Sequence, residues 1–166
     1  MSVPKSQRTE SRLHVHVELR RVVSHTLTKT RNSRKFGSVA TYAIERDDEG
    51  RVVAISEQRA SSREALARHL EDEAIAAASC AWRANDIRVG ERGEGWGRRR
   101  DLQNRSIEHL DCLLMLVNVA RDACGLTGRE VRHWSELVTD TRDLVRRWRD
   151  ADAKRYGRRA RGDEGL

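Results

Sequence analysis

The sequence has little proline and few aromatic residues, and both shortages favour helices over sheets. Proline occurs once, at Pro4, so nothing after it breaks a helix by lacking a backbone donor. Aromatic residues make up 4% of the chain, which is low for a β-sandwich. Hydrophobic residues are 37% of 166 positions, enough for the core of one compact domain. These proportions indicate an all-α or mostly α-helical fold.

Cysteine and long apolar runs are also scarce. Cys80, Cys112 and Cys124 are odd in number and form no Cys-x-x-Cys pair, which argues against a disulfide framework. They fall on apolar faces of expected helices, as small core residues in a reducing cytoplasm do. Residues 1–10 contain no apolar signal segment, and no later run of 18 apolar residues follows. We therefore expect a cytoplasmic protein without a membrane span.

Charge is abundant and unbalanced. The 33 lysines and arginines exceed the 26 acidic residues and give a formal net charge of +7, with a pI of about 10.0. A basic surface of this kind usually has an anionic partner, most often nucleic acid. The alternative is a solvated, arginine-rich surface that binds nothing.

The clearest helix spans Thr127 to Trp148. It opens with Thr127-Gly128-Arg129-Glu130, which has the spacing of a capping box. In that motif the Thr127 hydroxyl accepts the N–H of Glu130, and the Glu130 carboxylate accepts the N–H of Thr127. Apolar residues then recur at alternating steps of three and four and form a stripe more than about 100° wide, which must be buried. The stripe is Val131, Trp134, Val138, Thr141, Val145 and Trp148, widened by Leu137 and Leu144.

Three further helices are expected before it. Residues 10–30 fit either a strand alternation or a helical stripe, and their length without glycine or proline favours a helix. A second helix runs from about 65 to 87, capped by Ser61 or Ser62 and lined by alanines on one face. A third runs from about 101 to 124 and ends at Gly125. Residues 1–9 are expected to be a flexible N-terminus, and residues 154–166 a basic C-terminal tail.

A β-hairpin is expected between the first two helices, at about residues 38–58. Residues 38–45 and 51–56 are rich in β-branched and aromatic side chains, and Gly50 supplies the turn between them. Because an isolated hairpin is marginally stable, it should lean on the helices or on a neighbouring subunit. The expected fold is therefore an all-α (mostly) antiparallel four-helix bundle over residues 10–153, with a β-hairpin inserted between helices 1 and 2.

No residue pattern supports catalysis or a cofactor. The glycine-rich segment 89–97 lacks the Gly-Lys-Ser/Thr ending and the preceding strand of a phosphate-binding loop, so it is read as a connection between helices. Trp96 within it would stack on a base, fill a groove between subunits, or fold back on its own bundle. His109, Cys112 and His133 lack the spacing of a zinc site. We expect no enzymatic activity, no metal and no cofactor.

Three groups of basic residues are the strongest functional signal. Such residues contact the phosphate backbone without reading sequence, and their affinity falls steeply with salt. The first group directly precedes an expected helix start, where backbone N–H groups also favour phosphate. The alternative is a solvated face balanced by nearby aspartates. The groups are Arg98, Arg99 and Arg100; Arg20, Arg21, Lys29, Arg31, Arg34 and Lys35; and Arg146, Arg147, Arg149, Lys154, Arg155, Arg158 and Arg159.

The second half of the chain has a distinctive order of helix ends and leucines. It comprises Ala84-Asn85-Asp86-Ile87-Arg88 at a helix end, the linker Arg98-Arg99-Arg100, a leucine-rich stretch from Ile107 to Leu116, then Leu126-Thr127, and Leu137, Leu144 and Trp148. Over about residues 74–148 this order resembles the Avd-like four-helix-bundle family, the accessory variability determinants of diversity-generating retroelements. The family has a short link where the hairpin is expected here.

The resemblance implies a specific function. Members of the family are non-enzymatic, form a pentameric barrel with a basic surface, bind nucleic acid and associate with the reverse transcriptase of the element. They support cDNA synthesis from a template RNA, so the implied partners are a reverse transcriptase, RNA or an RNA–DNA duplex, and further copies of the chain. The matching residues are Asn85, Arg88 and Trp148, and Arg88 joins the candidate nucleic-acid-binding residues.

Two other functions stay open. A small helical subunit of another ribonucleoprotein, such as a CRISPR effector complex, would share the basic charge without the ring. A phage or mobile-element structural protein would use the bundle and hairpin for assembly alone. The candidate nucleic-acid-binding residues are Arg20, Arg21, Arg31, Arg34, Lys35, Arg88, Arg98, Arg99, Arg100, Arg147, Lys154 and Arg155.

Overall fold

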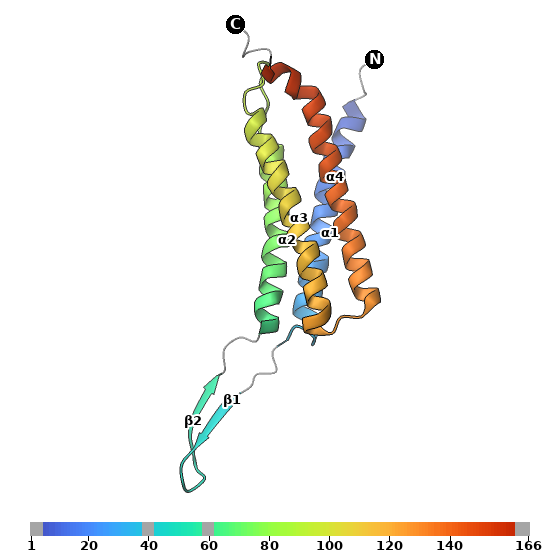
Figure 1. Ribbon diagram of the computed structural model, residues 1–166. Coiled ribbons are helices and arrows are strands. Elements are labelled where there is room, and N and C mark those ends of the chain that lie inside the picture. The colour runs from blue at the N-terminus through green and yellow to red at the C-terminus, as the bar shows by residue number, and fades with distance from the viewer. Residues whose placement is uncertain (1–4, 38–41, 58–61, 162–166) are drawn as a thin grey trace.

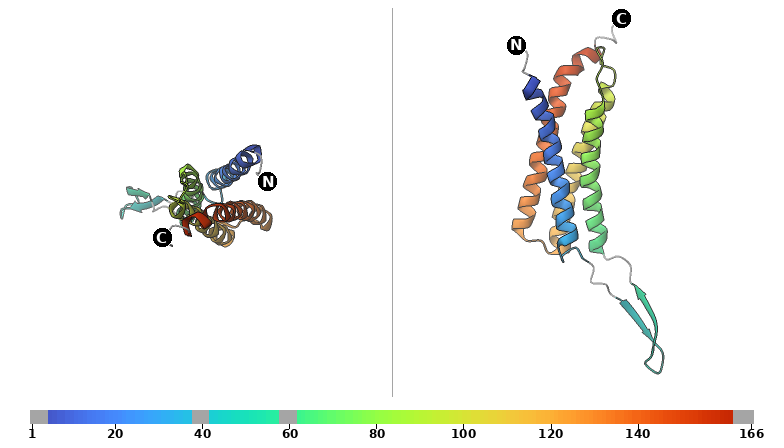
Figure 2. Two further views of the ribbon diagram at one scale, coloured as in Figure 1. Left: turned by 90° about the horizontal axis from the view of Figure 1, so that it is seen from above. Right: turned by 180° about the vertical axis from the view of Figure 1, so that it is seen from behind.

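Four long helices form a closed bundle (Figure 1). A computed structural model describes residues 5–37, 42–57 and 62–161. The helices are α1 (Lys5–Asn32), α2 (Ser62–Asp86), α3 (Trp96–Cys124) and α4 (Gly128–Arg161). Both α1 and α3 pack against α2 and α4, so the four enclose one core, as the view from above in Figure 2 shows. The predicted all-α bundle is confirmed.

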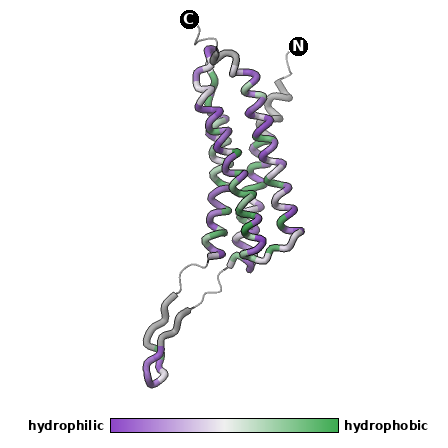
Figure 3. The backbone as a smooth tube through the Cα atoms, viewed as in Figure 1, coloured by the Kyte–Doolittle hydropathy of each residue, from purple (hydrophilic) through white to green (hydrophobic). Residues whose placement is uncertain are grey.

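The core is made by the stripes that the sequence predicted. Trp134 is 0% exposed and lies with Val138 and Val145 against Leu110 and Leu113 of α3. Hydrophobic and hydrophilic residues alternate in short stretches along every helix, as amphipathic helices require (Figure 3). Four alanines on one face of α2 are buried and allow a close approach of α3, namely Ala74, Ala77, Ala81 and Ala84. Ser106 of α3 shows this, because its hydroxyl donates to the carbonyl oxygen of Ala77 at 2.9 Å.

Local signals set the ends of α3 and α4. The Thr127 N–H donates to Glu130 Oε2 at 2.8 Å, and the Glu130 N–H donates to Thr127 Oγ1 at 3.3 Å, so the capping box is confirmed. Gly125 ends α3 with φ 64° and ψ 41°, a left-handed conformation that glycine adopts without strain. Its N–H donates to the carbonyl oxygen of Arg121.

Three helices are longer than predicted. Residues 5–9, expected to be flexible, belong to α1. The first turn of α3 begins at Trp96 because the indole is buried and anchors it, with Gly95 making the preceding turn at φ 79°. The expected tail from residue 154 is helical to Arg161 because Asp152 and Tyr156 are buried beyond Trp148 and hold α4 on the bundle.

Two short strands lie between α1 and α2. β1 (Tyr42–Arg46) pairs antiparallel with β2 (Val52–Glu57), and Ile44 lies opposite Ile55. Asp47 Oδ1 accepts the N–H groups of Glu49 and Arg51 in the turn. The strands extend beyond the end of the bundle where α1 ends and α2 begins (Figure 1). The rest of the predicted segment 38–58, residues 38–41 and 58, lies outside the described residues.

The three cysteines are free thiols, with Cys80 and Cys124 buried and Cys112 half-buried. Burial raises the pKa of each thiol, which keeps it protonated and unreactive near neutral pH. Within the described ranges, no helix combines the length and the apolar character needed to cross a bilayer.

Candidate nucleic-acid interface

Arg99 is an internal residue, so its prediction as a phosphate contact is wrong. Its side chain is buried, and the residue is 2% exposed. Its Nε donates to Asp152 Oδ2 at 2.8 Å, and its Nη2 lies 2.7 Å from the same oxygen. Its Nη1 donates to the Ile87 carbonyl oxygen at 3.0 Å, and the guanidinium lies 5.2 Å from the Trp148 ring centroid. Arg99 thus ties the start of α3 to α4 and to the segment after α2.

The early start of α3 explains why the arginine triplet is divided. Successive residues of a helix point about 100° apart, so three in a row cannot share one face. Arg99 faces the core, while Arg98 and Arg100 are exposed on either side of it. In the part of the chain that the structure describes, neither of them forms an ion pair.

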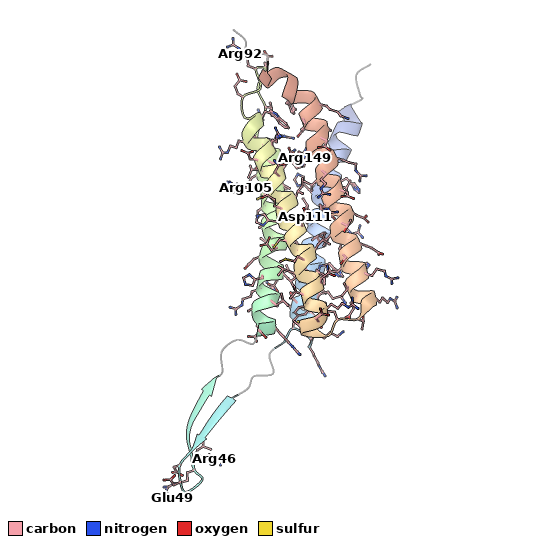
Figure 4. The ribbon with its side chains drawn as sticks, in the orientation of Figure 1. Arg46, Glu49, Arg92, Arg105, Asp111 and Arg149 are labelled. Atoms are coloured by element: carbon pink, nitrogen blue, oxygen red, sulfur yellow. The ribbon has the colours of Figure 1, made fainter. Side chains whose placement is uncertain are left out.

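The structure gathers exposed cations at one end of the bundle. The α2–α3 connection and the last turns of α4 lie at the same end (Figure 1), joined by the Arg99–Asp152 ion pair. Glu91, Glu94 and Asp101 lie among the cations and reduce the positive charge. Figure 4 shows Arg92 at this end. We call the exposed set the basic end, comprising Arg88, Arg92, Arg98, Arg100, Lys154 and Arg155.

Among the described side chains of α1, Arg21, Lys29 and Arg31 are engaged in ion pairs. Arg21 pairs with Glu18 at 2.9 Å within α1. Arg31 pairs with Glu71 of α2 at 3.0 Å, and the hydrogen bond from Arg31 lowers the pKa of Glu71. Surface pairs of this kind contribute little stability and can exchange for phosphate.

Lys35 is engaged at the start of α4. It donates to Glu130 Oε2 at 2.7 Å, and with Thr127 it lowers the pKa of Glu130 to about 2. Arg20 and Arg34 are exposed and, among the described residues, form no ion pair.

The third group is divided along α4. Arg146 pairs with Asp111 of α3 at 3.4 Å, and Arg149 pairs with Asp150 at 2.9 Å. Figure 4 labels Asp111 and Arg149. Arg147 is exposed, and the guanidinium of Arg155 lies 5.4 Å from the Tyr156 ring centroid. The side chains of Arg158 and Arg159 lie outside the described residues.

The tryptophans differ sharply in exposure. Trp96 is 6% exposed and its ring centroid lies 5.9 Å from that of Tyr156, so it folds back on its own bundle. Trp82, near the end of α2, is 58% exposed. The sequence analysis made no prediction for Trp82, and its position outside the alanine-lined face of α2 is the signal that could have indicated its exposure.

His109 contacts a carboxylate. Its Nδ1 lies 2.7 Å from Glu73 Oε2 of α2. Across the described residues, no group of three or more histidine, cysteine, aspartate or glutamate side chains is arranged to hold a metal ion.

Comparisons with known proteins give no further assignment. No family model, no curated protein and no solved structure matches this chain.

Proposed function

We propose that this chain is a non-enzymatic, nucleic-acid-binding accessory protein that self-associates and docks onto a reverse transcriptase. In that role it would hold RNA or an RNA–DNA duplex during cDNA synthesis from a template RNA in a diversity-generating retroelement. The observation that carries the binding part is the set of exposed cations at the basic end. The reverse transcriptase and the pentameric ring are supported by the resemblance of residues 74–148 to the Avd-like family.

The basic end suits a polyanion because its charges are free to act. Within the described residues, Arg88, Arg98, Arg100 and Lys154 form no ion pair, so a phosphate needs to displace no carboxylate from them. Neutralising phosphates with such residues releases condensed counterions, which drives binding. Gly95, the N-cap residue of α3, provides no side-chain hydrogen bond to the helix start, and backbone N–H groups at a helix N-terminus favour phosphate.

Self-association is supported by a different surface. Met115 and Val119 lie one turn apart on α3 and are exposed, and Cys112 beside them is half-buried. Glu108 and Asp122, also exposed on α3, make this surface unattractive to phosphate. An apolar patch bordered by carboxylates fits a protein partner, and a further copy of the chain is the simplest one.

Paired substitutions test the basic end. Arg98→Ala with Arg100→Ala should weaken binding to a labelled RNA oligonucleotide and lower the salt slope by about 1.4, since each lost contact on a single strand removes about 0.7. Arg129→Ala with Arg132→Ala is the matched control, because it removes the same charge from exposed positions at the start of α4. Arg99 is left unchanged because it is buried.

Equal losses in the two variants would show that only net charge matters, and no loss in either would remove the basic end from the interface.

Light scattering with and without nuclease tests the ring. A nuclease-resistant pentamer is expected. A monomer that binds RNA would instead favour the small ribonucleoprotein subunit, and an oligomer that does not bind RNA would favour the assembly protein.

A further inference from the structure

Trp82 is the tryptophan that the bundle leaves at the surface. Trp134 and Trp96 are buried, and Trp148 is partly buried beneath the Arg99 guanidinium. Trp82 lies four residues before α2 ends at Asp86, which places it about 6 Å along the helix axis from that end. Its indole therefore takes little part in the core, and its aromatic face is accessible to a partner.

One neighbour holds the indole ring in place. The ring centroid of His16, on α1, lies 5.4 Å from that of Trp82 at an interplanar angle of 63°, an edge-to-face contact. His16 itself lies 6.3 Å from the Trp148 ring in a similar arrangement. Burial lowers the pKa of His16, so the imidazole is neutral near pH 7 and adds no charge. Trp82 is thus positioned by the bundle while more than half of it faces solvent.

The exposed charges around Trp82 are of both signs, with arginines in the majority. Arg20 follows His16 by one turn of α1 and is close enough to lower the pKa of that histidine. Arg83 is the next residue after Trp82, and Arg88 follows the end of α2. All three arginines are exposed, and none forms an ion pair in residues 5–37, 42–57 and 62–161. Asp86 opposes them, because it lies one turn after Trp82 on α2 and acts on His16 more strongly than Arg20 does.

The arginines around Trp82 favour a nucleic acid over a protein surface as its partner. An apolar protein surface placed on Trp82 would bring the three arginines near a low-dielectric medium with only Asp86 to compensate them. A nucleic acid supplies phosphates for the arginines and a flat base for the indole. The Met115–Val119 surface, with its neighbouring carboxylates, has the opposite character and fits the protein contact better.

We propose that Trp82 stacks on an unpaired base of a single-stranded segment of RNA, while Arg20 and Arg83 contact the adjoining phosphates. This inference rests on the proposed function and specifies its ligand, because a base is available to an aromatic side chain only where it is unstacked and unpaired. Arg88 belongs to the basic end and lies two residues after α2 ends, so the RNA strand would continue from Trp82 onto that surface. The proposed interface therefore includes Trp82, which belongs to none of the three groups of basic residues identified in the sequence.

The test compares Trp82→Leu and Trp82→Phe with the unchanged chain, on a labelled single-stranded RNA and on a blunt RNA duplex of the same length. Leucine keeps apolar bulk but removes the aromatic face, so it should weaken single-strand binding about tenfold or more. Phenylalanine should retain most of the affinity. Duplex binding and the salt slope on the single strand should not change, because stacking releases no counterions.

Ile75→Ala is the matched control, since Ile75 is also exposed on α2 and lies two turns before Trp82. It should leave binding unchanged. Far-ultraviolet circular dichroism checks that all variants keep their helices, which the exposure of both residues leads us to expect.

The outcomes separate the two proposals. If the unchanged chain binds neither RNA at low salt, both proposals fail. If it binds single strands and Trp82→Leu binds them equally well, stacking is overturned while the proposed function stands. If Trp82→Leu lowers the mass of the oligomer and leaves RNA binding intact, Trp82 belongs to a protein interface and stacking is again overturned.

Discussion

Arg99→Ala should strongly destabilise the bundle, although its neighbour Arg98 can be changed at little cost. In the unchanged chain Asp152 is 5% exposed, and the substitution removes its ion-pair partner. Among the described residues, the carboxylate would keep the hydrogen bond from Gln103 Nε2, at 2.9 Å, and no other that the structure shows. Removing one partner of a buried ion pair costs about 3–5 kcal/mol of the free energy of unfolding, because the remaining charge stays buried and uncompensated.

Urea denaturation followed by circular dichroism measures this cost. With a slope of about 2 kcal/mol per molar urea, the midpoint should fall by about 2 M. Arg98→Ala is the control, since that side chain is exposed and its loss should change stability by less than about 0.5 kcal/mol.

A double substitution tests whether the loss of stability comes from the unpaired Asp152 carboxylate. Arg99→Met with Asp152→Leu removes both charges and fills similar volumes, so it should be much closer to the unchanged chain than Arg99→Ala is. If Arg99→Ala is as stable as Arg98→Ala, Arg99 does not make the buried ion pair. It would then return to the list of possible phosphate contacts.

Two further predictions concern the core and the start of α4. Trp134→Ala should lower the free energy of unfolding by about 3–5 kcal/mol in the same urea experiment, because the indole is fully buried, and a fully stable variant would contradict its place in the core. Glu130 has its pKa lowered from 4.5 to about 2 by Lys35 and Thr127. Its contribution to stability is therefore present above about pH 4.5 and is lost as the pH falls from there toward 2. Glu130→Gln should flatten the fall of the melting temperature over that range, and an unchanged pH profile would show that this carboxylate is not linked to folding.

The parts of the fold that follow from neighbouring residues could be predicted from the sequence. The capping box needs only Thr127 and Glu130, and the end of α3 needs only a glycine at position 125. The stripe through Trp134 depends on spacing alone. Helix identity and packing faces therefore followed from the amino-acid pattern.

The burial of Arg99 could not be predicted from its neighbours, because its ion-pair partner is distant in the sequence. Asp152 lies 53 residues further along the chain, and a run of three arginines does not show which of them is paired. A usable signal was present nonetheless. Trp96, Arg99, Gln103 and Ser106 recur at steps of three and four, so they extend the buried stripe of α3 upstream.

The length of α4 was underestimated for a similar reason. Asp152 and Tyr156 continue the buried face of the helix, but one is charged and the other lies in a strongly basic segment. A search for apolar residues alone therefore ended the helix at Trp148. Trp82 belongs to none of the basic groups of the sequence, because it is a single aromatic residue outside the alanine-lined face of α2.

The most direct test of nucleic-acid binding is the salt dependence of the affinity of the unchanged chain for a single-stranded RNA. Fluorescence anisotropy from about 50 to 300 mM salt should give a straight line of log K against log salt, falling by about 0.7 for each phosphate contacted. Binding that does not change with salt, or no binding at the lowest concentration, would contradict a nucleic-acid interface built from exposed arginines.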